Sequence, residues 1–98
     1  MSQGTCEGCP LCRRSALVAS IDLHRKHYKC SACGEFVVLR SAERRLAKAA
    51  STTLERYANE VRATTNPDYI YVIAGPTPDA PAHVDLQGES RLRADALR

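Results

Sequence analysis

Two pairs of cysteines constrain the fold of this chain more than any other feature of its sequence. Two residues separate Cys9 from Cys12, the same gap separates Cys30 from Cys33, and seventeen residues lie between the pairs. A two-residue gap lets two thiolates of one tight turn bind a single metal ion, and this interval is typical of a tetrahedral zinc site. The sequence therefore predicts one structural Zn²⁺, held by Cys9, Cys12, Cys30 and Cys33.

A fifth cysteine leaves the ligand set open at one position. Cys6 also precedes Cys9 by two residues, so it is a possible substitute for Cys12. Four sulfur ligands would also suit an iron centre, which remains the alternative metal. Sulfur ligands on all four sides leave no open position for water or substrate, so the pattern disfavours a catalytic metal.

The residues around the two pairs match a known pattern. They read Cys9-Pro10-Leu11-Cys12 and then Tyr28-Lys29-Cys30-Ser31-Ala32-Cys33-Gly34, with Phe36 beyond. This resembles a zinc ribbon over about residues 6–40, and is similar to the N-terminal ribbons of small prokaryotic and phage proteins of unassigned role. The resemblance implies two metal-binding turns, here called knuckles, joined by a β-hairpin. Arg13 departs from the pattern, in which glycine often follows the first pair.

Periodicity predicts the remaining elements. Residues 16–22, 27–29 and 35–40 are expected to form the ribbon strands, with a turn at 24–26 and a mobile start at 1–8. A long amphipathic helix is expected over 41–63, capped by Ser41, because one apolar stripe runs along it. That stripe consists of Leu46, Ala50, Leu54, Tyr57 and Val61.

The C-terminal third contains one strong strand signal. Tyr69–Ala74 is apolar at every position, so this strand is expected to be covered on both faces. Residues 83–86 are a second, short candidate. The predicted fold is therefore a small α+β protein: a ribbon over residues 1–40, a helix and strand packed on it over 41–86, and a flexible tail over 87–98, with one or two helical turns over 89–98 as the alternative.

Positive charge gathers in the first two thirds of the chain. Residues 1–62 hold eleven Lys and Arg against six Asp and Glu, whereas residues 63–98 hold three against five. Zinc on four thiolates would lower the overall charge from +3 to about +1. Such a moderate charge suits an acidic protein surface or a nucleic acid. The candidate binding residues lie at the ribbon–helix junction: Arg13, Arg14, Arg40, Arg44, Arg45 and Lys48.

Catalytic patterns are missing from the sequence: it has no glycine-rich phosphate loop, no Ser–His–Asp set and no paired carboxylates. We therefore expect no enzymatic activity and no small-molecule substrate. Two classes remain, a protein-binding regulator, adaptor or small inhibitor of the kind that phages and mobile elements encode, and a nucleic-acid-binding module. An exposed edge at Tyr69–Ala74 would also allow a homodimer.

The sequence also favours a reducing compartment. The N-terminal residues are polar, five cysteines fit poorly with a disulfide scaffold, and no stretch has the length and apolarity of a membrane span. The expected location is the cytoplasm, away from membranes.

Overall fold

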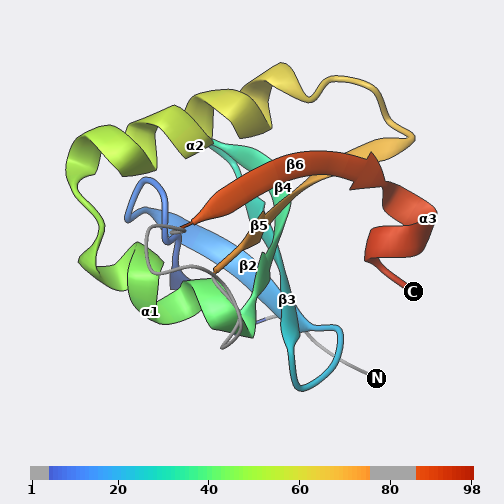
Figure 1. Cartoon of the computed structure of the whole chain (residues 1–98), viewed down its shortest axis with the longest axis horizontal. Helices are drawn as coiled ribbons and strands as arrows, with labels where there is room; N and C mark the ends of the chain where they lie inside the picture. Colours follow the sequence, from blue (N-terminus) through green and yellow to red (C-terminus); the bar gives the residue numbers. More distant parts are fainter. Residues whose placement is uncertain (1–4, 76–85) are drawn as a thin grey trace.

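The computed structural model describes residues 5–75 and 86–98, which form a small α+β fold (Figure 1). Within these residues, six strands build one mixed sheet in which the spatial order follows the chain. The strands are β1 (Thr5–Gly8), β2 (Ser15–Ser20), β3 (Arg25–Cys30), β4 (Gly34–Leu39), β5 (Tyr69–Ala74) and β6 (Gln87–Leu92). The helices are α1 (Arg40–Lys48), α2 (Ser51–Ala63) and α3 (Arg93–Ala96).

One pair of strands differs from the rest of the sheet. β1 to β4 pair in antiparallel fashion, as do β5 and β6, whereas β4 and β5 are parallel. Parallel neighbours need a long crossover, and α1 and α2 supply it. The sheet thus continues across the domain limits predicted at residues 40 and 86.

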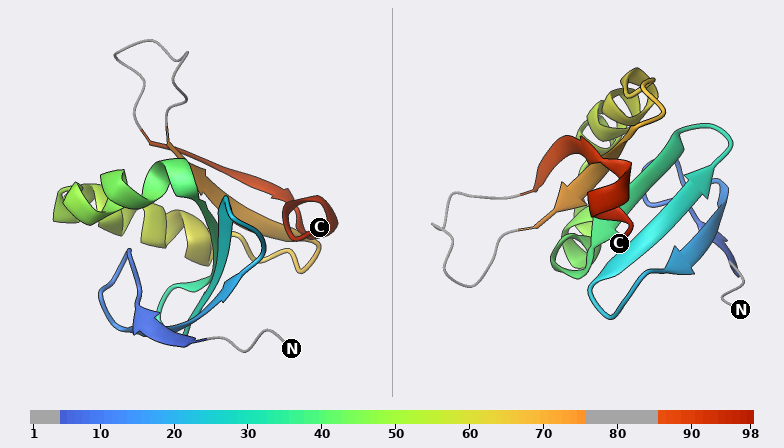
Figure 2. Two further views of the ribbon diagram at one scale, coloured as in Figure 1. Left: turned by 90° about the horizontal axis from the view of Figure 1, so that it is seen from below. Right: turned by 90° about the vertical axis from the view of Figure 1, so that its right-hand side faces the viewer.

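Both faces of the central strands are buried. On one face, α1 and α2 cover Phe36 and Val38 of β4 and Tyr71 and Ile73 of β5. The opposite face holds a smaller cluster, in which α3 packs near the strands; its members are Val37, Ile70, Val72 and Ala96. Figure 2 shows the two longer helices on one side of the sheet, with β1 and β6 at opposite edges. The expectation that Tyr69–Ala74 is covered on both faces is confirmed.

The predicted single helix over 41–63 is wrong, because α1 and α2 are separate helices. Ala49 and Ala50 are extended, with ψ of 149° and 152°. A straight helix over residues 41–63 would be about 34 Å long. The strands that it would cover, β4 and β5, have six residues each and span only about 20 Å. The break keeps both halves of the apolar stripe on the sheet, and Leu46 and Leu54 are both buried. Tertiary packing thus overrides the high helix propensity of alanine.

The predicted cap at Ser41 is also wrong. The helix begins one residue earlier, Leu39 is the N-cap residue, and no side chain caps the helix. The Ser41 hydroxyl contacts the end of β5 instead: it accepts a hydrogen bond from Gly75 N–H at 3.0 Å and donates to the Gly75 carbonyl at 3.4 Å. Ser41 therefore joins the start of α1 to the end of β5.

Three predictions about the edges of the sheet and the ends of the chain need correction. β5 lies between β4 and β6, so Tyr69–Ala74 is not an edge and cannot pair a second copy as expected. The tail expected over 87–98 is strand β6 followed by helix α3. At the other end, Thr5–Gly8 forms β1 although a mobile start was expected over 1–8. The short strand predicted over 83–86 falls mostly outside the described residues, and Leu86 is not in a strand.

Candidate metal centre and basic hollow

The two knuckles are the loops of two β-hairpins. Cys9 and Cys12 lie between β1 and β2, and Cys30 and Cys33 lie at the turn from β3 to β4. Backbone hydrogen bonds close the first knuckle: Cys9 N–H donates to the Arg14 carbonyl at 2.6 Å, and Arg13 N–H donates to the Cys9 carbonyl at 2.8 Å. The pairing of β2 with β3 then places the two knuckles side by side.

Each knuckle ends in a left-handed residue. Gly34 has a φ of 109°, and Arg13, one residue after Cys12, has a φ of 66°. Gly34 adopts this conformation without strain, whereas the Cβ of Arg13 clashes with its own backbone at a cost of about 1–2 kcal/mol. Arg13 therefore occupies a backbone conformation that glycine, the residue often found there in the zinc-ribbon pattern, adopts more readily.

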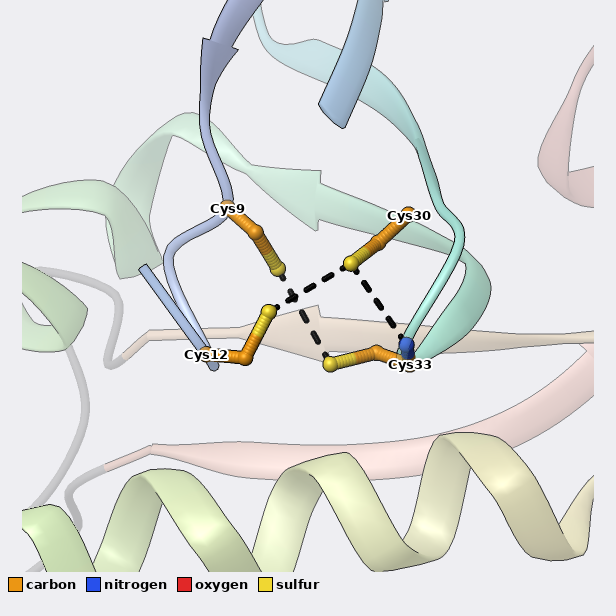
Figure 3. Close-up of side chains that lie close together, drawn as sticks. All are labelled: Cys9, Cys12, Cys30 and Cys33. Atoms are coloured by element: carbon orange, nitrogen blue, oxygen red, sulfur yellow. Dashed lines mark hydrogen bonds between the residues drawn. The ribbon is translucent and has the colours of Figure 1, made fainter. Parts of the chain in front are cut away.

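The four sulfur atoms converge on one point (Figure 3). All lie within 4.8 Å of one another, with Cys9 Sγ 4.0 Å from Cys33 Sγ and Cys12 Sγ 3.4 Å from Cys30 Sγ. Ligand sulfurs about 2.3 Å from a tetrahedral zinc ion lie about 3.8 Å apart. The cluster thus has the dimensions of a four-sulfur site and could hold a metal ion. Cys9, Cys30 and Cys33 are buried, and Cys12 is half-buried.

Burial sets the charge state of the thiols. It raises the pKa of Cys9 to about 11, in part against the backbone N–H groups of Cys12 and Leu11, and it raises the pKa of Cys33 as well. Burial also acts on Cys30, but the N–H groups of Cys33 and Ala32 and two neighbouring thiols outweigh it and lower the pKa of Cys30 to about 7. Cys30 therefore ionises before Cys9 and Cys33, and a cation that binds all four sulfurs must displace protons from those two.

Two histidines are metal ligands by residue type, but neither belongs to the cluster. His27 Nε2 contacts the Glu35 carboxylate at 3.0 Å, and His24 is exposed on the β2–β3 turn. The backbone of Cys6 pairs with Leu17 in the sheet. The Cys6 side chain is outside the described part of the structure, so its role as a substitute ligand stays a prediction.

The centre is also tied to the helical layer. Arg62 Nε of α2 donates a hydrogen bond to the Ala32 carbonyl of the second knuckle at 3.2 Å. Leu11 of the first knuckle and Val61 of α2 belong to the same buried cluster as the cysteines. The position of α2 is therefore coupled to the shape of the knuckles.

Three of the predicted binding residues meet in one hollow. Arg44, Arg45 and Lys48 line a depression of about 590 Å³ where α1 gives way to α2. The other described residues of its lining are small or apolar, and we call this surface the basic hollow; these residues are Ala49, Ala50, Thr53 and Leu86. The break between the helices creates the hollow.

The other three predicted residues do not line this hollow. Arg13 and Arg14 are exposed on the first knuckle, and Arg40 is exposed at the start of α1, where its N–H donates to the His24 carbonyl at 2.7 Å. The first knuckle and the α1–α2 connection lie toward the same end of the long axis (Figures 1 and 2). Of the six predicted binding residues, three therefore line the basic hollow, and the other three are exposed arginines outside it.

Charge in the basic hollow is little compensated by the described residues. The one carboxylate in α1, Glu43, forms an ion pair with Lys26 at 3.3 Å. In residues 5–75 and 86–98, neither Arg44 nor Lys48 has a carboxylate partner. Within the described residues, these two cations are open to an external anion.

The aromatic residues near the basic side chains are not available for stacking on bases. Tyr28 and Phe36 stack on each other with ring centroids 5.2 Å apart, and are 7% and 0% exposed. Both belong to the core under the helices. Binding of single strands usually combines basic residues with exposed aromatic rings, and this part of the surface lacks the rings.

Sequence reasoning missed the apolar half of the basic hollow. Ala49, Ala50 and Leu86 are brought together only because the helix breaks between two alanines. Alanine is the strongest helix former, so the sequence carries no local signal for that break.

The chain matches no model of a known protein family, and no curated protein or solved structure is significantly similar to it. Among the described residues, no helix has the length and apolarity needed to cross a membrane.

Proposed function

We propose that this chain is a non-catalytic zinc-ribbon protein that binds an acidic protein surface through the basic hollow and acts as a regulator, adaptor or small inhibitor. The observation that carries the proposal is the composition of the hollow, in which three cations line the same depression as small and apolar residues. Protein interfaces combine an apolar centre with a polar rim, and arginine is enriched among the residues that dominate binding energy.

Zinc is the metal that the donor set favours. Thiolates are soft ligands, and four of them in a tetrahedral array suit Zn²⁺ or an iron centre. A saturated site serves the fold, because it leaves no position for a substrate. The role of the ion is then to fix the knuckles on which β2, β3 and β4 are aligned.

Elemental analysis tests the metal. Protein purified without added metal should contain about one equivalent of zinc per chain. Cys33→Ser should lower that content severalfold, whereas Cys6→Ser should retain it. If the protein contains iron in place of zinc, the assignment of the metal is wrong. Loss of metal from Cys6→Ser alone would overturn the ligand assignment.

A rigid hollow favours recognition of an anionic partner. Side chains on a fixed scaffold lose little conformational freedom on binding, which improves affinity at a given contact area. An acidic segment with an apolar side chain would satisfy both halves of the hollow, whereas a phosphate backbone would satisfy the cations alone. This difference favours a protein partner over a nucleic acid.

Fluorescence anisotropy with defined probes distinguishes these partners. The probes are a peptide of Asp and Glu interrupted by leucines, the same peptide with serine for leucine, and random 20-nucleotide DNA in single- and double-stranded form. We expect the leucine-containing peptide to bind most tightly. Tighter binding of either DNA with a steep loss in salt would replace the proposal by the nucleic-acid function.

Charge reversal then tests the surface. Arg44→Glu/Lys48→Glu should weaken peptide binding at least tenfold, equivalent to about 1.4 kcal/mol. The matched control is Lys29→Glu/Arg98→Glu, which changes the net charge equally at exposed sites outside the hollow. Equal losses in both variants would mean that net charge, not the hollow, attracts the probe, and the proposed surface would be wrong.

A further inference from the structure

The outer edge of β6 is the one long, regular strand edge in the described part of the sheet. The opposite edge strand, β1, has four residues, while β6 has six that are paired continuously with β5 and contain neither proline nor lysine. Proteins usually protect such an edge with proline, lysine, a bulge or a covering element. β6 has none of the first three, and five of its six residues are exposed.

Backbone direction shows which groups of β6 face outward. Arg93 N–H, next in register after Leu92, donates to the Asp68 carbonyl at 2.8 Å, so Arg93 forms a hydrogen-bonded pair with Asp68. Hydrogen-bonded and non-hydrogen-bonded pairs alternate in an antiparallel ladder. The N–H and C=O groups of Gly88, Ser90 and Leu92 therefore point away from β5.

These outward groups are self-complementary about Ser90. If a second β6 lies antiparallel with Ser90 opposite Ser90, then Gly88 lies opposite Leu92 and each of these pairs exchanges both backbone hydrogen bonds. The register leaves Glu89 directly opposite Arg91 of the other copy. That pair is of the non-hydrogen-bonded kind, in which Cα atoms approach to about 4.5 Å and side chains are closest.

Charge and shape fit the same register. Glu89 and Arg91 contact each other within one chain at 2.5 Å and are mostly exposed, so they can re-pair across a two-fold axis. Leu92, with 47% of its surface exposed, would lie opposite Gly88. Glycine is required at position 88, because the Tyr71 hydroxyl occupies the space that a Cβ would need. A hollow of about 490 Å³ lies beside Gly88, and Tyr57, Tyr71 and Leu86 are among the residues that line it.

We propose that two copies of this chain form a symmetric dimer by antiparallel pairing of their β6 strands, centred on Ser90. The two sheets then become one continuous sheet. Opposite charges meet at both Glu89–Arg91 contacts, and each Leu92 lies against Gly88 and Tyr71 of the other copy. A two-fold interface of this kind is closed, so it yields dimers without further polymerisation.

Sedimentation velocity on the full zinc-loaded chain tests the assembly. The expected mass is about twice the 10.7 kDa of one chain. Ser90→Pro should raise the dissociation constant at least tenfold, because it removes an outward N–H while the bonds to β5 remain. Circular dichroism and zinc content establish that this variant is folded. A wild-type protein that is monomeric throughout the concentration range, or a folded Ser90→Pro variant that dimerises normally, would overturn the proposal.

Charge variants test the register without proline. Glu89→Arg and Arg91→Glu should each be monomeric, since like charges would then face each other across the axis. A mixture of the two should form heterodimers, because every cross-strand pair in that complex is again of opposite sign. The double variant should dimerise like the wild type. Failure of the mixture to associate would exclude the Ser90-centred register.

A further variant separates this interface from the basic hollow. Arg44→Glu/Lys48→Glu changes residues that belong to the α1–α2 surface and should leave the dimer intact. If it abolishes the dimer while the β6 variants do not, the two copies meet at the basic hollow and the β6 interface is wrong.

Discussion

Gly75 lies so close to Ser41 that a β-carbon at position 75 would be 2.0 Å from the Ser41 carbonyl oxygen. The two residues are also joined by the hydrogen bonds of the Ser41 hydroxyl. The end of β5 therefore approaches the start of α1 at backbone contact distance, and only glycine permits it.

The first prediction concerns this contact. Gly75→Ala should lower the free energy of unfolding by about 2 kcal/mol, because the added methyl group must displace backbone. Gly8→Ala is the matched control, since nothing lies within 4 Å of a Cβ there. Chemical denaturation of both zinc-loaded variants measures the difference. A Gly75→Ala variant as stable as Gly8→Ala would mean that α1 moves freely away from β5.

A second prediction addresses the left-handed backbone at Arg13. Arg13→Gly should raise stability by about 0.5–1 kcal/mol, because relief of the Cβ clash exceeds the added entropy of the unfolded chain. Arg14 is the next residue, is exposed and has no positive φ. Arg14→Gly should therefore lower stability. Thermal denaturation compares the two, and equal losses would contradict a strained knuckle.

Removal of the metal is expected to unfold both layers. Structural zinc contributes about 10–16 kcal/mol in small peptides, which is comparable to the whole stability of a small domain, about 5–15 kcal/mol. The two helices have nine and thirteen residues, and isolated helices shorter than about 12–15 residues are marginal. Far-UV circular dichroism should lose strand and helix signal on chelation and recover both when zinc returns. An unchanged spectrum with the metal removed would show that the core suffices.

Acid should weaken the link between the sheet and the C-terminal segment. Glu35 accepts from Arg93 Nη1 at 2.8 Å and contacts His27 at 3.0 Å. Partial burial raises the pKa of Glu35, but Arg93 and then His27 outweigh this and hold it below its ordinary value of 4.5. A depressed pKa means that the ionised carboxylate stabilises the fold fully above pH 4.5, and that this contribution disappears as the pH falls through the folded-state value.

Glu35→Gln makes that contribution measurable. The wild type should be more stable than Glu35→Gln near neutral pH, and the gap should close as the pH falls below 4.5 and through the depressed pKa of Glu35. Because metal loss in acid affects both proteins, the difference between them at each pH is the quantity to follow. Glu55→Gln removes an exposed carboxylate that has no ion pair among the described residues, and should show no such trend. A constant gap for Glu35→Gln would exclude an ionic role.

The sequence predicted those parts of the fold that carry their own local signal. Cysteine spacing identified the cluster of Cys9, Cys12, Cys30 and Cys33, and the strand at Tyr69–Ala74 was found with its observed bounds. β6 could not be found in this way, because its residues are mostly polar and exposed on both faces. It is a strand because β5 offers it a ladder of backbone groups. The sequence likewise carries no signal for the helix break at Ala49–Ala50, because the break follows from the short strands that the helices cover.

The parallel pairing of β4 with β5 has a consequence for synthesis. β1 to β4 join neighbours through short turns and can assemble as they emerge, but β4 finds its second partner only after the whole crossover has been made. Non-local pairing of this kind closes late, at an entropic cost that local hairpins avoid. Until then β4 presents a bare edge, and Val37 lacks the residues that bury it in the complete fold, Ile70, Val72 and Ala96. A nascent chain stalled before Tyr69 is therefore the species most prone to aggregate.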